Sequence, residues 1–149
     1  MNIAIVTGAS SGLGRSFIRQ LDRQGGLDEI WGVARRRERM EELAAQLSTP
    51  MRPLALDLTK TESVETLRAL LRETGADVRV LVNSAGFGKF GTYADMTLQE
   101  TEDMIDLNCR AAVALTAAAI PHMSRGARIL EICSSAAFQP LPGFNVYAA

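Results

Sequence analysis

A glycine-rich segment near the N-terminus constrains the fold more than any other part of this sequence. Residues 7–14 read Thr-Gly-Ala-Ser-Ser-Gly-Leu-Gly. They follow the apolar, β-branched run 3–6 and precede Phe17, Ile18 and Leu21, which recur at helical spacing. A strand, a glycine-rich turn and a helix in this order are the context in which such glycines bind a dinucleotide.

Each glycine of the turn has a separate physical role. Gly8 lets the chain leave the strand sharply, Gly12 lets a pyrophosphate approach the backbone, and Gly14 lets the helix pack closely. The N–H groups at the start of the helix, together with its dipole, would then face the phosphates. The other residues of the turn expected to line the cofactor are Ser10, Ser11 and Leu13.

Length and composition indicate one soluble globular domain over residues 1–149. The chain is 47% hydrophobic and 22% charged, with a net charge of −1, which is typical of such domains. This charge balance gives no strong attraction to nucleic acid or to an anionic membrane. The apolar runs are too short for a membrane span, and no signal peptide is recognised at the N-terminus. We therefore expect a cytoplasmic protein.

The cysteines do not indicate a metal site. Cys109 and Cys133 are far apart in the sequence and lack the spacing of metal ligands. We expect both to be reduced, buried thiols and expect no bound metal.

Apolar patterning predicts an α/β fold in which strands and helices alternate. Capping boxes at 59–62 and 97–100 mark two helix starts. Strands alternating with helices predict a Rossmann-like, doubly wound parallel sheet with helices on both faces, in the order 3-2-1-4-5 and truncated after the fifth strand. The predicted strands are 2–7, 29–34, 54–56, 80–82 and 129–132, and the predicted helices are about 12–24, 35–47, from 59 to beyond 71, and 97 to about 121.

Three further motifs accompany the glycine-rich turn. Asn83-Ser84-Ala85-Gly86 follows the fourth strand, Asn108 lies inside the long helix, and Ser134 precedes Tyr147 by thirteen residues. With these motifs the whole chain resembles the N-terminal part of a short-chain dehydrogenase/reductase, of the single-domain branch with Thr-Gly-x-x-x-Gly-x-Gly. Ser84 departs from that family's Asn-Asn-Ala-Gly.

The resemblance implies a catalytic set. Asn108 and Tyr147 match the family's Asn and Tyr, and Ser134 is preferred to Ser135 because of its separation from Tyr147. The family's lysine, one helical turn after the tyrosine, would lie two residues beyond Ala149. We therefore expect the 149 residues to be part of a longer chain, and to be poorly active by themselves.

The residue types suit carbonyl reduction. Ser134 would donate a hydrogen bond to an oxygen on which negative charge develops, and Tyr147 would deliver the proton. A free phenol has a pKa of about 10, so a nearby lysine and an oxidised nicotinamide would be needed to favour the phenolate. By resemblance, Asn108 interrupts the long helix and holds a water in the proton relay.

The residues that follow the second strand indicate which nicotinamide cofactor the chain binds. An NAD site needs a carboxylate about twenty residues past the glycines, but this chain has Arg35, Arg36 and Arg37 there and no acid before Glu38. We therefore predict NADP, bound by Arg35 first and Arg36 second, with NAD less favoured. A solvated basic turn is the alternative.

The resemblance also implies cofactor contacts along the carboxyl edge of the sheet. Asp57 would lie at the adenine, although it is also a reasonable loop or cap residue. The remaining implied contacts are Leu58, Asn83, Ala85 and Gly86.

These observations predict an NADP-dependent oxidoreductase that transfers a hydride to or from a small carbonyl or alcohol substrate. The alternatives are a nucleotide-binding module without catalysis and a truncated, inactive fragment. By resemblance we expect a homo-oligomer, with neither nucleic acid nor membrane as a partner.

Overall fold

A computed structural model describes residues 1–139 and 141–149 of the chain. Within these residues a parallel sheet has the strand order β3-β2-β1-β4-β5, which confirms the predicted topology. The strands are β1 (Asn2–Thr7), β2 (Glu29–Ala34), β3 (Met51–Ala55), β4 (Asp77–Asn83) and β5 (Arg128–Glu131). The α-helices are α1 (Gly12–Gln24), α2 (Arg37–Ala44), α3 (Thr61–Thr74), α4 (Leu98–Ile105), α5 (Ala111–Ala119) and α6 (Asn145–Ala148).

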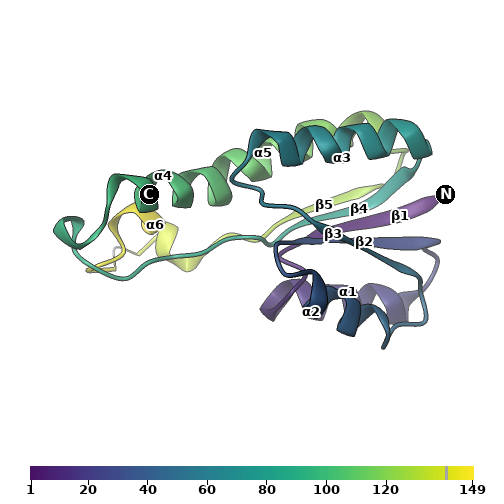
Figure 1. Cartoon of the computed structure of the whole chain (residues 1–149), viewed down its shortest axis with the longest axis horizontal. Coiled ribbons are helices and arrows are strands. Elements are labelled where there is room, and N and C mark those ends of the chain that lie inside the picture. The colour runs from purple at the N-terminus through teal and green to yellow at the C-terminus, as the bar shows by residue number, and fades with distance from the viewer. Residues whose placement is uncertain (140) are drawn as a thin grey trace.

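Helices cover both faces of the sheet, as predicted. Helices α1 and α2 lie on one face, and α3 and α5 lie on the other (Figure 1). Alternate residues of a strand point to opposite faces, so Ile3 and Ile5 join the core under α3 and α5, while Val6 joins the core over α1 and α2. Because both faces are apolar, the central strands are buried on both sides.

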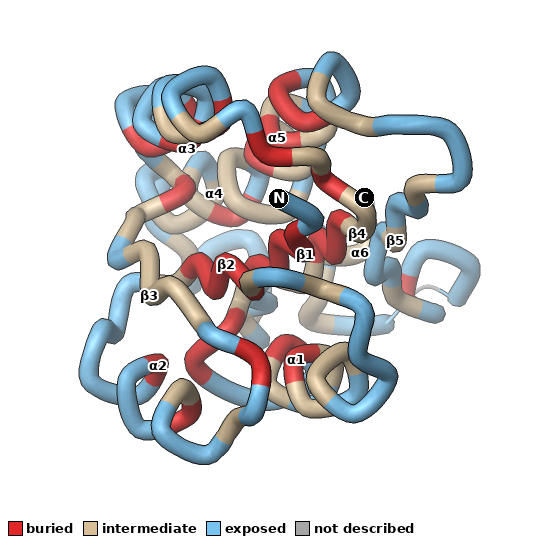
Figure 2. The backbone as a smooth tube through the Cα atoms, turned by 90° about the vertical axis from the view of Figure 1, so that its right-hand side faces the viewer, coloured by how far each residue is buried: buried red, intermediate tan, exposed pale blue. Residues whose placement is uncertain are grey.

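Burial falls from the centre of the sheet to its edges. Strands β1, β2 and β4 are mostly buried, whereas β5 is largely exposed (Figure 2). The free thiols of Cys109 and Cys133 are exposed as well, so the prediction of buried thiols is wrong. Cys133 follows the edge strand β5, and Cys109 lies on the helix that follows α4.

Several element boundaries differ from the prediction: β4 already begins at Asp77, and α2 ends at Ala44. The starts of β3 and α2 differ because prolines and arginines gave misleading signals. Strand β3 begins at Met51 and includes Pro53. A proline is tolerated there because β3 is an edge strand with only one neighbouring strand. The N–H that proline lacks is therefore not needed for a hydrogen bond to a second neighbour. Helix α2 begins at Arg37, since Arg36 keeps an extended backbone.

One predicted capping box forms and the other does not. The Thr97 hydroxyl accepts from Glu100 N at 3.2 Å, and Thr97 N donates to the Glu100 carboxylate at 2.9 Å. In contrast, α3 begins only at Thr61, after Lys60, and has no side-chain cap. The Thr59 hydroxyl donates instead to Asp57 Oδ1 at 2.8 Å.

The long predicted helix is interrupted. A π-helical turn, Asp106–Arg110, separates α4 from α5. The combined stretch Leu98–His122 is long enough to span a membrane, and an 18-residue window within it has a mean hydropathy of 1.2. It contributes Met104, Leu115 and Ala119 to the buried interior, which is how a core helix of an α/β domain behaves.

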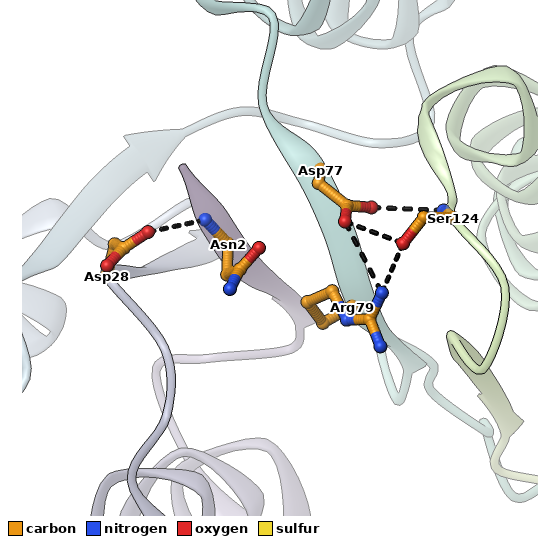
Figure 3. A network of polar contacts seen from close by, with 5 residues as sticks. All are labelled: Asn2, Asp28, Asp77, Arg79 and Ser124. Atoms are coloured by element: carbon orange, nitrogen blue, oxygen red, sulfur yellow. Dashed lines mark hydrogen bonds and ion pairs between the residues drawn. The ribbon is translucent and has the colours of Figure 1, made fainter.

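Polar contacts fasten the amino edge of the sheet, opposite the glycine-rich turn. Asp77 accepts from Ser124 N at 3.0 Å and from the Ser124 hydroxyl at 2.7 Å, and Arg79 contacts both residues (Figure 3). At the same edge, Asn2 N donates to Asp28 at 2.6 Å. The contacts of Asp77 and Arg79 with Ser124 hold the start of β4 to the turn that leads into β5, and the Asn2 contact holds the start of β1 to the segment before β2.

Candidate active site

The glycine-rich turn after β1 and the segment 83–86 at the end of β4 are joined at the carboxyl edge of the sheet. The Thr7 hydroxyl, at the end of β1, accepts from Ser84 N at 3.0 Å and from Ala85 N at 2.9 Å. The Ser84 hydroxyl in turn donates to the Thr7 carbonyl. The glycine-rich turn and the segment after Asn83 therefore lie side by side, as predicted from the parallel topology.

The turn itself has the geometry that its glycines predict. Gly8 has a φ of +69°, and a Cβ at Gly14 would lie 2.3 Å from the Gly8 carbonyl oxygen. Only glycine fits at Gly14, because helix α1 starts in contact with the turn. A Cβ at Gly12 would meet nothing within 4 Å, so the space beside that backbone is open for a ligand.

A cleft of about 510 Å³ runs along this edge. It extends from the glycine-rich turn, past the ends of β2 and β3, to the segment after β4 and to one side of α4. The predicted residues that line it are Gly8, Ser10, Ser11, Arg35, Arg36, Asp57, Leu58, Ala85 and Gly86. Its volume is in the range of sites for small molecules and cofactors.

One end of the cleft is cationic. The Arg36 guanidinium donates to the Ser10 hydroxyl at 3.1 Å and lies 3.5 Å from the Ser11 hydroxyl. The end of β2 is thereby held against the glycine-rich turn. The same arrangement places a guanidinium and a hydroxyl where they can bind one anionic group together.

Asp57 also lines the cleft and has local partners. It accepts from Thr59 N at 3.0 Å and from the Thr59 hydroxyl. Partial burial raises the pKa of Asp57, but the Thr59 hydrogen bonds and the charges of Arg35 and Lys60 outweigh it and leave that pKa below its ordinary value. Asp57 is therefore an ionised acceptor that organises its own loop.

Four predicted cofactor residues lie outside the cleft lining. Gly12, Leu13 and Gly14 belong to the first turn of α1, where Leu13 is 59% exposed. Asn83 is buried, and its amide donates to Glu131 at 2.7 Å and to the Thr116 hydroxyl at 3.0 Å. This side chain joins β4 to β5 and α5, so its immediate role in the structure is to hold the sheet and the helix together.

Asn108 lies in the π-helical turn, where the regular helix is interrupted. The N–H of Ala111 bonds to the carbonyl of Asp106, five residues back. The Asn108 side chain pairs with the backbone of Phe87, donating to its carbonyl at 2.8 Å and accepting from its N–H at 3.0 Å. Such π-turns are frequent at functional sites, and this one fixes Asn108 against the segment after β4.

Ser134 and Tyr147 lie beyond the carboxyl end of β5. The Ser134 hydroxyl accepts from Ala136 N at 3.2 Å and caps a short 3-10 turn, Ser135–Ala137. Tyr147 belongs to α6, which packs against α4 and against that turn. The elements that carry Asn108, Ser134 and Tyr147 therefore gather at one end of the molecule (Figure 1).

Several residues of this region were not predicted from the sequence. The Thr7 hydroxyl and the Phe87 backbone hold the motifs together, and Lys60, Gln99 and Asp103 line the cleft. The position of Lys60, just past a strand, is a signal that could have found it. Thr7 is the first residue of the glycine-rich motif, but no local pattern marks Phe87, Gln99 or Asp103, because their contacts join segments far apart in the sequence.

Comparison with known proteins gives a consistent picture. The family model described as "short chain dehydrogenase" matches residues 2–149. The chain is 32% identical over 150 residues to the NADP-dependent 3-hydroxy acid dehydrogenase YdfG of Escherichia coli, covering 99% of this chain and 60% of that enzyme. The chain thus spans less than two thirds of the length of that relative.

Solved structures agree with the sequence relatives. A bulky-bulky ketone specific alcohol dehydrogenase from Comamonas testosteroni has a TM-score of 0.89 and 28% identity, covering 99% of this chain and 61% of that one. A short-chain dehydrogenase from Sphingobium yanoikuyae in complex with NADPH has a TM-score of 0.87 and 29% identity, covering 99% and 59%. With the family model matching almost every residue, this chain belongs to the short-chain dehydrogenase family of oxidoreductases.

Proposed function

We propose that the complete protein transfers a hydride between NADP(H) and the carbonyl or alcohol group of a small molecule. The observation that carries the choice of cofactor is the cationic end of the cleft. Arg36 lies 3.1 Å from the Ser10 hydroxyl, Arg35 lines the same cleft, and no carboxylate follows β2 before Glu38. This end suits the 2′-phosphate that distinguishes NADP from NAD.

The contacts favour Arg36 over Arg35 as the principal phosphate ligand, which reverses the order predicted from the sequence. Arg36 already shares the glycine-rich turn with Ser10, whereas the charge of Arg35 acts on Asp57. A hydrogen bond between charged groups contributes about 1.5–3 kcal/mol, which corresponds to roughly a ten- to hundredfold preference for NADP. The NADP-dependent Escherichia coli relative and the NADPH complex of the Sphingobium neighbour support this choice.

The cofactor, when bound, supplies or accepts the hydride. Residues of this chain have the remaining roles. Ser134 donates a hydrogen bond to the substrate oxygen, which stabilises the charge that develops there. Tyr147 passes a proton to or from that oxygen, and Asn108, held by Phe87, supports the proton relay.

The substrate is a small carbonyl or alcohol compound, since the relatives named above act on 3-hydroxy acids or on ketones. We also infer a homo-oligomer, because Ile105, Val113 and Ile120 on α4, α5 and the turn that follows are 50%, 71% and 54% exposed. A face of this kind is typical of a protein–protein contact. We place the protein in the cytoplasm, where its two free cysteines would remain reduced.

The test is steady-state kinetics of the complete protein over a panel of aldehydes, ketones and alcohols with NADP(H) and NAD(H). We expect turnover with NADP(H), at least a tenfold fall in kcat in Tyr147→Phe, and a selective loss of NADP affinity in Arg36→Asp, with a smaller one in Arg35→Asp. Residues 1–149 assayed alone should turn over slowly, because Tyr147 lies in a four-residue helix with little stability of its own.

Three outcomes would contradict the proposal. Cofactor binding without turnover on any substrate would indicate a nucleotide-binding module. An unchanged rate in Tyr147→Phe would remove the proton-transfer role. Equal losses of NADP and NAD affinity in the arginine variants would remove the cofactor assignment.

A further inference from the structure

The segment after β4, residues 85–88, reaches from the cofactor cleft to Tyr147. Ala85, Gly86 and Phe87 line the cleft. The backbone of Phe87 holds the Asn108 amide through two hydrogen bonds. A Cβ at Gly86 would lie 3.0 Å from Asn108 Oδ1, so the backbone and the amide are already in close contact there.

Gly88, the last residue of this segment, lies against the ring of Tyr147. A Cβ at Gly88 would lie 2.8 Å from Tyr147 Cδ2 and 3.0 Å from Tyr147 Cγ. Both atoms belong to the base of the ring, so a small rotation of the phenol cannot relieve the contact. Gly88 is not among the glycines with positive φ, so glycine is needed at this position for space and not for backbone conformation.

The ring of Phe144 lies beside the Tyr147 ring and also contacts Gly88, since a Cβ at Gly88 would lie 3.0 Å from Phe144 Cε1. Phe144 packs edge-on against the Tyr147 ring, with ring centroids 5.4 Å apart and an interplanar angle of 64°. Phe90 packs in the same way on Phe144 at 5.2 Å, and Gly91 N donates to the Gly143 carbonyl at 2.9 Å. The bare backbone of Gly88 therefore contacts the Tyr147 and Phe144 rings where the two meet.

We propose that Gly88 is a positioning residue for Tyr147, and that residues 85–88 set Tyr147 and Asn108 in register with each other and with the cofactor. One short stretch of backbone contacts the cleft, the relay amide and the phenol in turn. The inference rests on the proposed function, because it takes Tyr147 to be the proton-transfer residue.

The size of the effect follows from the contact distance. Carbon atoms pack at about 3.5–4.0 Å, so an alanine Cβ at Gly88 displaces the ring by about 1 Å. A displacement of about 1 Å can cost a factor of about 10² in rate. We expect Gly88→Ala to lower kcat tenfold to a hundredfold, with an NADP(H) dissociation constant within twofold of wild type, because Gly88 lies outside the cleft lining.

The experiment compares wild type, Gly88→Ala, Gly75→Ala and Tyr147→Phe in the complete protein. Gly75 ends α3 at the amino edge, has a φ of +58° and has open space around it. Gly75→Ala is therefore the control: it should lower the Tm through backbone strain and leave kcat unchanged. A nuclear Overhauser contact between Gly88 Hα and the Tyr147 ring, identified by the change of the ring-proton chemical shifts in Tyr147→Phe, is expected whether or not the protein is active.

The results separate this inference from the proposed function. If Tyr147→Phe abolishes turnover while Gly88→Ala keeps its rate, the positioning role is refuted and the proposed function stands. The positioning role is likewise refuted if Gly88→Ala and Gly75→Ala lower the Tm by the same amount and Gly88→Ala shows no larger fall in kcat. If Tyr147→Phe keeps its rate, the proposed function fails, and the nuclear Overhauser contact alone then decides whether Gly88 sets the ring.

Discussion

Replacing Thr7 by valine tests the joint between the glycine-rich turn and the segment after β4. The Thr7 hydroxyl is the acceptor for two backbone donors, Ser84 N at 3.0 Å and Ala85 N at 2.9 Å. Thr7 itself is only 1% exposed. Valine has nearly the same shape, so Thr7→Val removes the acceptor and leaves both donors without this partner.

The expected loss can be estimated from those two donors. A buried N–H that loses its partner costs about 1–3 kcal/mol. Ser84 and Ala85 are half-buried, so water rehydrates them in part, and we expect a total loss of about 1–3 kcal/mol. At about 2–4 °C for each kcal/mol in a chain of this size, the Tm should fall by several degrees.

Urea unfolding measures this loss, with the fluorescence of Trp31, the one tryptophan of the sequence, as the signal. Thr7→Ser is the matched control, because it keeps the hydroxyl and loses only a methyl group. We expect the serine variant to be more stable than the valine variant at an unchanged m value. The reasoning is refuted if the serine variant is as unstable as the valine variant, or if Thr7→Val loses less than about 0.5 kcal/mol.

Two further predictions concern the start of α1 and the amino edge of the sheet. Gly14→Ala should destabilise the fold by more than Gly12→Ala in urea unfolding, because a Cβ at Gly14 would lie 2.3 Å from the Gly8 carbonyl oxygen. A Cβ at Gly12 meets nothing within 4 Å, so Gly12→Ala costs only the strain of a φ of +52°; equal losses would contradict this. Hydrogen bonds from the Ser124 hydroxyl, from Ser124 N and from Arg79 hold the pKa of Asp77 below its ordinary value of 3.8. Ionised Asp77 therefore stabilises the fold fully well above pH 3.8, and this stabilisation is lost as the pH falls through the lower folded-state pKa. Asp77→Asn should therefore differ from wild type in urea midpoint at pH 7 and much less near pH 2; the same difference at both pH values would show that ionised Asp77 contributes nothing.

Local patterns were enough for the first half of the nucleotide-binding unit. The bounds of β1, α1 and β2 agree with the prediction, because the apolar periodicity, the glycine-rich turn and the helix-ending Gly25 act within a few residues. The strand order was predicted too, because right-handed crossovers leave few arrangements for alternating strands and helices. The Thr97–Glu100 capping box formed for the same reason, since both of its residues lie in one turn.

Predictions failed where a local signal met a competing partner. Thr59 matches a capping box in sequence, but its hydroxyl donates to Asp57. Pro53 suggests a loop, but an edge strand accepts it beside β2. In both cases the deciding contact belongs to the three-dimensional neighbourhood and not to the sequence pattern.

The sequence by itself determined the family, the order of the strands and the residue types of the candidate site, since each depends on short motifs or on periodicity. Only the tertiary structure decided that Arg36 lies on Ser10, that Phe87 holds Asn108 and that Gly88 leaves room for Tyr147. The partners in these pairs are 26, 21 and 59 residues apart in sequence. Contacts over such separations form only when the parallel sheet brings the ends of its strands to one edge, so no local pattern encodes them.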